Sequence, residues 1–170
     1  MNLFKKDFDI RWSDLDANRH VANSAYQNFM SHTRMAYLMS HGFDHQDMVR
    51  LNIGPVIFHE HIHYFREVGA GQTITVTLQL KGLSKDGMFF EFEHNIYGKD
   101  GTHHNYTELM GGFIDLETRK LTTLPAELIS RVFDDLMRTD DFKWLAREDT
   151  RKHQIHPQNK PEWLSKNKTR

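Results

Sequence analysis

Polar and apolar side chains alternate along the middle of the chain, which is the pattern of a sheet with one packed face and one wet face. The alternation is clearest from Thr73 to Leu80, where it runs without a break. Asp-Gly pairs at 86–87 and 100–101 are typical of tight turns between antiparallel strands. We therefore predict strands over residues 8–12, 56–66, 73–80, 88–97 and 103–116. The adjacent Gly111 and Gly112 predict a bulge in the last of these strands.

Between the first two predicted strands, the apolar period changes to three and four residues, which predicts a helix. Its apolar positions are Ala22, Ala25, Tyr26, Phe29, Met30, Ala36, Tyr37 and Met39. Asn23 or Ser24 is expected to cap the start of this helix, and Gly42 to close its end. Because Arg34 is its only strong charge, we expect most of the helix surface to be covered.

The pattern weakens after a second predicted helix, which runs from Pro125 to about Met137. Acidic side chains outnumber basic ones before residue 138, and basic ones are in excess after it. A short helix is expected over 141–147. The remainder fits either a peripheral, partly disordered tail or a tail that Trp144 and Trp163 anchor on the body or on a second subunit.

Length and composition exclude several classes of protein. The 170 residues fit one domain, which we place in residues 1–137, followed by a charged C-terminal extension of residues 138–170. The chain has no cysteine, so it cannot hold a disulfide framework, an iron–sulfur cluster, a thiolate zinc site or a cysteine nucleophile. A net charge of −1 argues against a nucleic-acid partner.

The distribution of apolar residues also bears on location. No apolar run approaches the roughly 20 residues that span a bilayer. The N-terminal residues lack the apolar stretch and small-residue cleavage site of a secretory signal. We therefore expect a cytoplasmic protein without a membrane span.

Polar groups are concentrated between the first predicted strand and the first predicted helix. Asp14 and Asp16 stand two residues apart, and His20 precedes the start of the helix. The free N–H groups of that helix start, together with its dipole, favour a developing oxyanion beside these bases. This arrangement suits acyl transfer. The alternative is that both aspartates only shape the loop and cap the helix.

This segment resembles the signature of the hot-dog fold acyl-CoA thioesterases, in particular the 4-hydroxybenzoyl-CoA thioesterase-like family, which usually reads Asp-x-Asp-x-x-Gly-His-Val-x-Asn-x-x-Tyr. The matching residues are Asp14, Asp16, His20, Val21, Asn23 and Tyr26. The resemblance continues through residues 63–72 and covers about residues 6–137. It implies an α+β hot-dog fold, in which an antiparallel sheet wraps around a long central helix.

The chain departs from the family pattern at two positions. Arg19 replaces the usual glycine before His20, and Gln72 replaces the usual acidic residue of a turn. The loss of the glycine implies either a different backbone angle in the loop or a cation at the mouth of the site, where CoA phosphates pass. The sequence leaves both possibilities open for Arg19.

The resemblance also implies roles for individual residues. Asp16 matches the catalytic carboxylate, acting as a nucleophile or as a general base on water. The backbone N–H of Asn23 would polarise the thioester carbonyl. His20 would orient the loop or bind substrate, although a structural hydrogen bond is equally expected of it. Tyr26 would line the acyl pocket or simply pack in the core.

A second polar feature is the run His59-Glu60-His61-Ile62-His63. Alternate residues of a strand share a face, so the three histidines could bind zinc or nickel, with His103 or His104 as a possible partner. The alternative is a polar sheet face or a hydrogen-bonded layer between subunits, and we assign no metal site here.

These observations together predict an enzyme that hydrolyses an acyl-CoA thioester to a carboxylic acid and CoA, without a metal or organic cofactor. Family resemblance implies homodimers or homotetramers, with the site between subunits. Two alternatives remain: a hot-dog hydratase or dehydratase acting on acyl thioesters, and a non-catalytic protein that binds acyl groups or serves in an assembly. The acyl chain length, and the choice between CoA and an acyl-carrier protein, are not set by the sequence.

Overall fold

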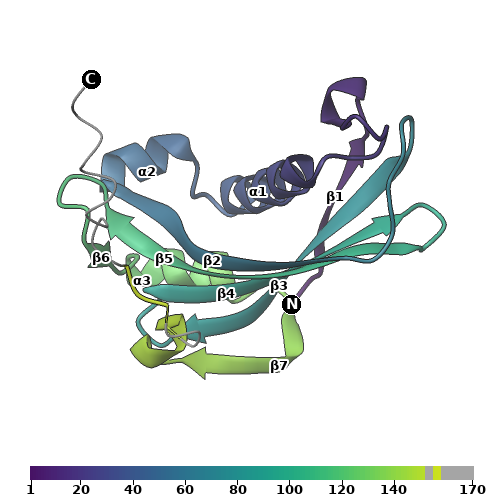
Figure 1. Cartoon of the computed structure of the whole chain (residues 1–170). Coiled ribbons are helices and arrows are strands. Elements are labelled where there is room, and N and C mark those ends of the chain that lie inside the picture. Colours follow the sequence, from purple (N-terminus) through teal and green to yellow (C-terminus); the bar gives the residue numbers. More distant parts are fainter. Residues whose placement is uncertain (152–154, 158–170) are drawn as a thin grey trace, which may run out of the picture.

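In the computed structural model, which describes residues 1–151 and 155–157, a curved sheet wraps around one long helix, α1 (Asn23–Ser40), as Figure 1 shows. Five strands pair antiparallel in the order β1 (Phe4–Asp9), β3 (Thr73–Ser84), β4 (Phe89–Gly98), β5 (His103–Asp115) and β2 (Ile53–Tyr64). The short β6 (Leu121–Thr122) pairs with β5. The predicted α+β architecture, an antiparallel sheet around a central helix, is confirmed.

The first strand lies earlier than predicted. It covers Phe4–Asp9 rather than residues 8–12, and Trp12–Asp14 form a single 3₁₀ turn instead. The alternation of apolar and polar residues that predicts a strand is interrupted here, because Lys6 occupies a half-buried position between Phe4 and Phe8. Its ammonium group lies 5.8 Å from the centre of the Phe8 ring, so the aliphatic stem takes the place of an apolar side chain.

A short helix, α2 (His45–Leu51), was not predicted. Asp44 caps it by accepting a hydrogen bond from the N–H of Asp47, and the Asp47 side chain accepts from the N–H of Asp44 in return. This reciprocal pattern is a capping box with aspartate in the third position. The helix ends at Asn52, which adopts the left-handed conformation with φ 57°.

The predicted bulge at Gly111 and Gly112 is wrong in position. The extra residue is Phe58 on the neighbouring β2, because Ile57 pairs with Gly111 and His59 pairs with Met110. The glycine at 111 has a different reason: a Cβ there would lie 2.5 Å from the Val56 carbonyl oxygen. Close packing, rather than an irregular backbone, requires glycine at this position.

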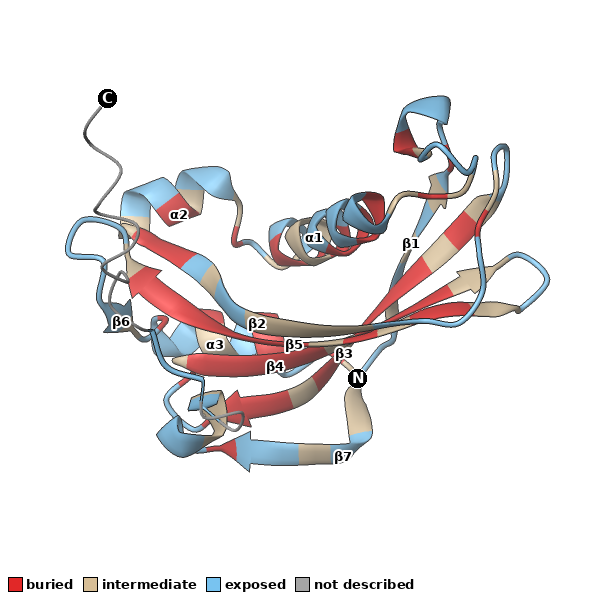
Figure 2. Ribbon diagram, in the orientation of Figure 1, coloured by how far each residue is buried: buried red, intermediate tan, exposed pale blue. Residues whose placement is uncertain are grey.

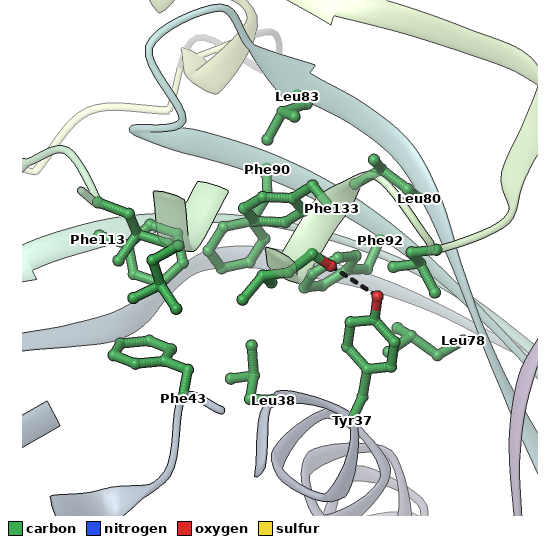
Figure 3. Close-up of a cluster of buried hydrophobic side chains, with 14 of the residues drawn as sticks. Tyr37, Leu38, Phe43, Leu78, Leu80, Leu83, Phe90, Phe92, Phe113 and Phe133 are labelled. Atoms are coloured by element: carbon green, nitrogen blue, oxygen red, sulfur yellow. Dashed lines mark hydrogen bonds between the residues drawn. The ribbon is translucent and has the colours of Figure 1, made fainter. Parts of the chain in front are cut away.

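The main core lies between the sheet, the C-terminal half of α1 and the helix α3 (Ala126–Phe133), which ends before the predicted Met137. Its fully buried aromatic members are Phe43, Phe90, Phe113 and Phe133. Figure 3 shows the link between the two helices: the Tyr37 hydroxyl of α1 donates a 2.6 Å hydrogen bond to the Val132 carbonyl of α3. In Figure 2 the buried residues follow the central strands and the sheet-facing side of α1.

The predicted helix over 141–147 is wrong, because residues 138–145 form a strand, β7 (Arg138–Leu145), that pairs parallel with β3. The strand uses the part of the β3 edge that β1 leaves open, and Asp141 adds an ion pair to Lys81 at 2.6 Å. Trp144 is half exposed and packs edge-on against Phe142. The other proposed anchor, Trp163, lies outside the described residues. No helix in the described part of the chain is long and apolar enough to cross a membrane.

His94 makes the stability of the fold dependent on pH. It is fully buried beneath α1, and burial, reinforced by the charge of Arg34, lowers its pKa to about 3. The unfolded chain therefore binds a proton that the folded chain does not between about pH 6.5 and pH 3. The contribution of neutral, buried His94 to the stability is therefore complete above about pH 6.5, and it is lost as the pH falls toward 3.

From this pKa difference we expect His94 alone to lower the free energy of unfolding by about 2 kcal/mol between pH 7 and pH 5. Urea denaturation of the wild type and of His94→Asn, each at pH 7 and pH 5, measures this change in the free energy of unfolding. Asparagine cannot take up the proton, so the free energy of unfolding of the variant should fall by about 2 kcal/mol less than that of the wild type. An equal loss in both proteins would contradict the assignment.

Candidate active site

Asp14 stabilises the loop between β1 and α1 through several hydrogen bonds. Its carboxylate accepts hydrogen bonds from the N–H of Arg11 at 2.9 Å and from the Arg11 guanidinium at 2.8 and 3.1 Å. These hydrogen bonds hold the pKa of Asp14 below its ordinary value. Its carbonyl accepts from the N–H of Ala22, which fixes the entry into α1. Asp14 is buried and fully engaged, so its contacts are those of a structural residue.

Asp16 lies at the rim of a pocket and has one carboxylate oxygen to spare. Its Oδ1 accepts hydrogen bonds from the N–H groups of Asn18, at 2.8 Å, and His20, at 3.3 Å. Among the described residues, none donates a hydrogen bond to Oδ2. The pocket has a volume of about 310 Å³, and its wall includes Asn23 and Tyr26 as well as Asp16. Asp16 is thus held by the backbone while it keeps a free face toward the pocket.

The start of α1 forms the opposite part of this pocket. The predicted cap by Asn23 or Ser24 is wrong: the N-cap residue is Ala22, and no side chain caps the helix. Within residues 1–151 and 155–157, no acceptor takes up the N–H of Asn23 or Ser24. The first turn therefore presents unsatisfied N–H groups and the positive end of the helix dipole. Gly42 stands just beyond the helix end with φ 68°, as predicted.

The segment after β2 closes the pocket. The N–H of Val21 donates to the Val68 carbonyl at 2.8 Å, and His20 forms a bridge with Gly69. The Nε2 atom of His20 lies 3.0 Å from a carboxylate oxygen of Glu67. His20 thus joins the Asp16 loop to this segment, and its ring also lines the pocket.

The departure at Gln72 preserves the turn. Its side-chain oxygen accepts a 2.7 Å hydrogen bond from the N–H of Gly69, and its carbonyl accepts one from Ile10. The neutral amide oxygen thus provides an acceptor for this turn, as a carboxylate could.

Tyr26 and Tyr64 stand edge to face at the pocket, with ring centres 5.2 Å apart. Tyr26 is buried, and desolvation raises its pKa to about 12, so the phenol stays neutral. Sequence reasoning did not identify the pocket residues Tyr64, Phe65 and Glu67, and it named Arg66 only as one of several unassigned candidates for contacts with CoA phosphates. No local signal marks them, because only the strand order brings the end of β2 beside the start of α1.

Arg19 lies in the left-handed region that favours glycine, with φ 66°. Of the two possibilities that the sequence left open, this conformation does not favour a changed backbone angle in the loop. Its side chain is exposed and is not part of the pocket wall. A non-glycine residue in the left-handed region costs about 1–2 kcal/mol. We therefore expect Arg19→Gly to raise the free energy of unfolding by up to about 1 kcal/mol, allowing for the greater freedom of unfolded glycine. Thermal unfolding measures this change, and a lower melting temperature would contradict it.

The histidines of β2 do not come together as a metal site. Across the described ranges, no group of three or more His, Asp or Glu side chains could hold a metal ion. The rings of His59 and His61 stack with centres 5.4 Å apart. Glu60, between them in the sequence, instead contacts Gln27 of α1. The arrangement places the histidines on the sheet face that points away from α1.

Comparisons with known proteins identify the family of the chain. The family model described as the thioesterase-like superfamily matches residues 10–132. No curated protein sequence matches the chain. Among solved structures, YbaW, a probable thioesterase of Escherichia coli, is 27% identical, with a TM-score of 0.65 over 75% of this chain and 95% of its own.

Two further structures share the fold at lower identity. A Staphylococcus aureus protein in complex with CoA is 21% identical, with a TM-score of 0.71 over 92% of this chain and 96% of its own. A 1,4-dihydroxy-2-naphthoyl-CoA thioesterase from Synechocystis is 16% identical, with a TM-score of 0.69 over 77% and 96%. The fold is the hot-dog fold, and the match over residues 10–132 shows that the chain belongs to the thioesterase-like superfamily.

Proposed function

We propose that this protein hydrolyses acyl-CoA thioesters to a carboxylic acid and CoA. The observation that carries the proposal is that one pocket is lined both by Asp16, whose Oδ2 accepts no hydrogen bond from the described residues, and by the uncapped first turn of α1. A base or nucleophile and a set of oxyanion donors are the two elements that acyl transfer needs.

In the proposed reaction, the thioester carbonyl oxygen accepts a hydrogen bond from the N–H of Asn23. Asp16 then either removes a proton from a water molecule that attacks the carbonyl carbon, or attacks that carbon itself to form an anhydride that water hydrolyses. In both routes the C–S bond breaks, and the CoA sulfur leaves with the electron pair and takes up a proton. The fixed N–H dipoles stabilise the negative charge that develops on the oxygen.

The remaining pocket residues bind and position the substrate. The buried, neutral ring of Tyr26 provides an apolar wall for the part of the acyl group next to the carbonyl. His20 is proposed to orient the loop through Glu67. For Arg19, we propose a peripheral contact with CoA phosphates, since its exposed cation lies in the same loop. No part of this scheme requires a metal or an organic cofactor.

CoA as the thiol is supported by the Staphylococcus aureus neighbour, whose structure contains CoA, and by the name of the Synechocystis enzyme. We also propose membership of the 4-hydroxybenzoyl-CoA thioesterase-like branch, on the residues of the loop signature. A cytoplasmic location remains part of the proposal.

We propose that the protein forms homodimers or homotetramers. β2 is an edge strand, and its Ile57 and Phe58 side chains are 40% and 38% exposed. An unpaired edge with apolar side chains favours pairing with a second copy. Light scattering is expected to give twice or four times the mass of the chain, and a monomer at micromolar concentration would contradict this.

A thiol-release assay over a series of acyl-CoAs and acyl-carrier-protein thioesters tests the function. We expect release from acyl-CoAs. An absence of release from every thioester would favour a non-catalytic acyl-binding protein. Hydration or dehydration of the acyl chain without thiol release, followed by mass spectrometry, would favour the hydratase alternative.

A further inference from the structure

A largely buried cation stands in a second pocket, between α1 and the sheet, away from the candidate catalytic groups. Arg34 lies on α1, eleven residues after Asn23, which corresponds to about 16 Å along the helix axis. Only 13% of its side chain is exposed. It lines a pocket of about 150 Å³ whose other walls are mostly apolar, including Met35, Ile57 and Phe90. Burying a charge is costly unless it is paired and hydrogen-bonded, so the partners of this arginine indicate what it does.

The strongest contact of Arg34 is with a neutral partner. The Nδ1 atom of His94 lies 2.7 Å from the Thr77 carbonyl oxygen, which can only accept, so Nδ1 carries the proton. The other ring nitrogen, Nε2, then accepts from the Arg34 guanidinium at 3.1 Å. Burial lowers the pKa of Arg34 to about 10, and the group remains charged at neutral pH. His94 thus orients the guanidinium without balancing its charge.

The carboxylate nearest to Arg34 does not reach hydrogen-bonding distance. A Glu60 oxygen lies 3.9 Å from Arg34 Nη2, beyond the usual 2.7–3.2 Å or so of an N–H···O bond. The other Glu60 oxygen accepts from the Gln27 side chain at 3.2 Å. A guanidinium has five N–H donors. Among the described residues, one hydrogen bond and one long ion pair engage it, so donors remain available to a ligand in the apolar pocket.

Side-chain contacts between α1 and β2 run from the candidate active site toward this pocket. The Tyr26 ring of α1 packs against the Tyr64 ring of β2 beside the candidate active site. Further along, the Gln27 side chain of α1 donates a hydrogen bond to Glu60 of β2. The Arg34 pocket then joins α1 to the start of β2. An acyl chain whose carbonyl lies at Asn23 and whose tail runs along α1 on the side of β2 would bring its far part to Arg34.

We propose that Arg34 is a specificity-determining residue that selects acyl groups carrying an oxygen acceptor in their far part. This inference rests on the proposed thioester hydrolysis and names its substrate class: oxygenated acyl chains, with a hydroxyl, carbonyl or carboxylate group, rather than plain hydrocarbon chains. A hydrocarbon tail would cover the guanidinium and leave its donors unsatisfied, whereas an oxygen would accept from them. Sites built to hydrogen-bond a substrate group discriminate strongly against analogues that lack it.

The test uses matched acyl-CoA substrates of equal chain length that end in a methyl, a hydroxyl or a carboxylate group, over a series of lengths. For the wild-type protein, we expect kcat/KM for at least one oxygenated substrate to exceed that of its methyl partner by about tenfold or more, which corresponds to about 1.4 kcal/mol. The hydroxyl and carboxylate arms identify which acceptor the site takes. Preference for the methyl partner at every length would overturn the proposal without any variant being made.

Three variants separate specificity from folding. Methionine has a similar length and no charge. Arg34→Met should therefore bring the ratio of kcat/KM for the oxygenated substrate to kcat/KM for its methyl partner close to one, mainly by raising KM for the oxygenated substrate. Arg34→Lys should keep part of the preference, because it keeps a donor. Arg50→Met, at an exposed arginine of α2, should leave the ratio unchanged. An unchanged ratio in folded Arg34→Met would overturn the proposal.

The two proposals fail in different ways. If the wild-type protein hydrolyses plain and oxygenated acyl-CoAs equally well, the role of Arg34 is excluded and thioester hydrolysis stands. If it hydrolyses none of them, the proposed function fails and the inference on Arg34 fails with it.

Discussion

Replacement of Asp16 by asparagine is expected to lower kcat for thioester hydrolysis by about 10²–10⁴-fold, the range typical of a lost general base. Asparagine keeps an oxygen that can accept from the N–H groups of Asn18 and His20, so the loop should hold its shape. It cannot take a proton from water or form an anhydride. Steady-state thiol release with a good acyl-CoA substrate measures the effect.

The matched control is Asp140→Asn, which makes the same chemical change at an exposed aspartate of β7. Its kcat should equal that of the wild type, and both variants should unfold at close to the wild-type temperature. A folded Asp16→Asn protein that retains more than about a tenth of the wild-type kcat would remove Asp16 from the mechanism.

Replacement of Phe113 by alanine is expected to lower the free energy of unfolding by about 3–5 kcal/mol, as for other buried phenylalanines. Phe113 is 1% exposed and lies at the centre of the core, with its ring against those of Phe43, Phe90 and Phe133. The loss combines the missing apolar contacts with the cavity that remains. Urea denaturation followed by circular dichroism measures the change.

Phe65→Ala is the control for this loss, because its ring is 54% exposed. We expect a change of less than about 1 kcal/mol there, since little apolar surface returns to water. A Phe113→Ala protein as stable as the wild type would mean that the core around the end of α1 is not packed as described.

The central features of the fold follow from local patterns in the sequence. The apolar spacing that predicted a helix from about Ala22 to Met39 matches α1, because one side of this helix faces a sheet along its whole length. The alternation over 73–80 matches β3, which has a polar and an apolar face. Asp-Gly turns fixed the hairpins between β3, β4 and β5, because glycine takes the positive φ they need.

The features that sequence reasoning missed depend on distant partners. Residues 138–145 form a strand only because β1 leaves part of the β3 edge unpaired, which no local pattern reveals. The bulge lies at Phe58 of β2, because the position of the extra residue depends on the pairing of β2 with β5 and not on the glycines of β5 alone.

The candidate site was only partly predictable for the same reason. Asp16, His20, Asn23 and Tyr26 belong to one continuous segment, and the structure places all four at one pocket. Tyr64 and Glu67 enter it through the order of the strands. The contact between Arg34 and His94 joins residues that are sixty positions apart, and each one alone looks like an ordinary polar residue.

The central claim is that the Asp16 carboxylate and the N–H of Asn23 act on the same carbonyl group. A crystal structure with a CoA ketone, in which a methylene group separates the carbonyl from the sulfur and prevents hydrolysis, tests it most directly. The claim predicts the ketone oxygen about 2.7–3.1 Å from the Asn23 nitrogen, with Asp16 in reach of the carbonyl carbon directly or through one water molecule. A ketone bound with its oxygen turned away from the start of α1, and its carbon beyond the reach of Asp16, would contradict it.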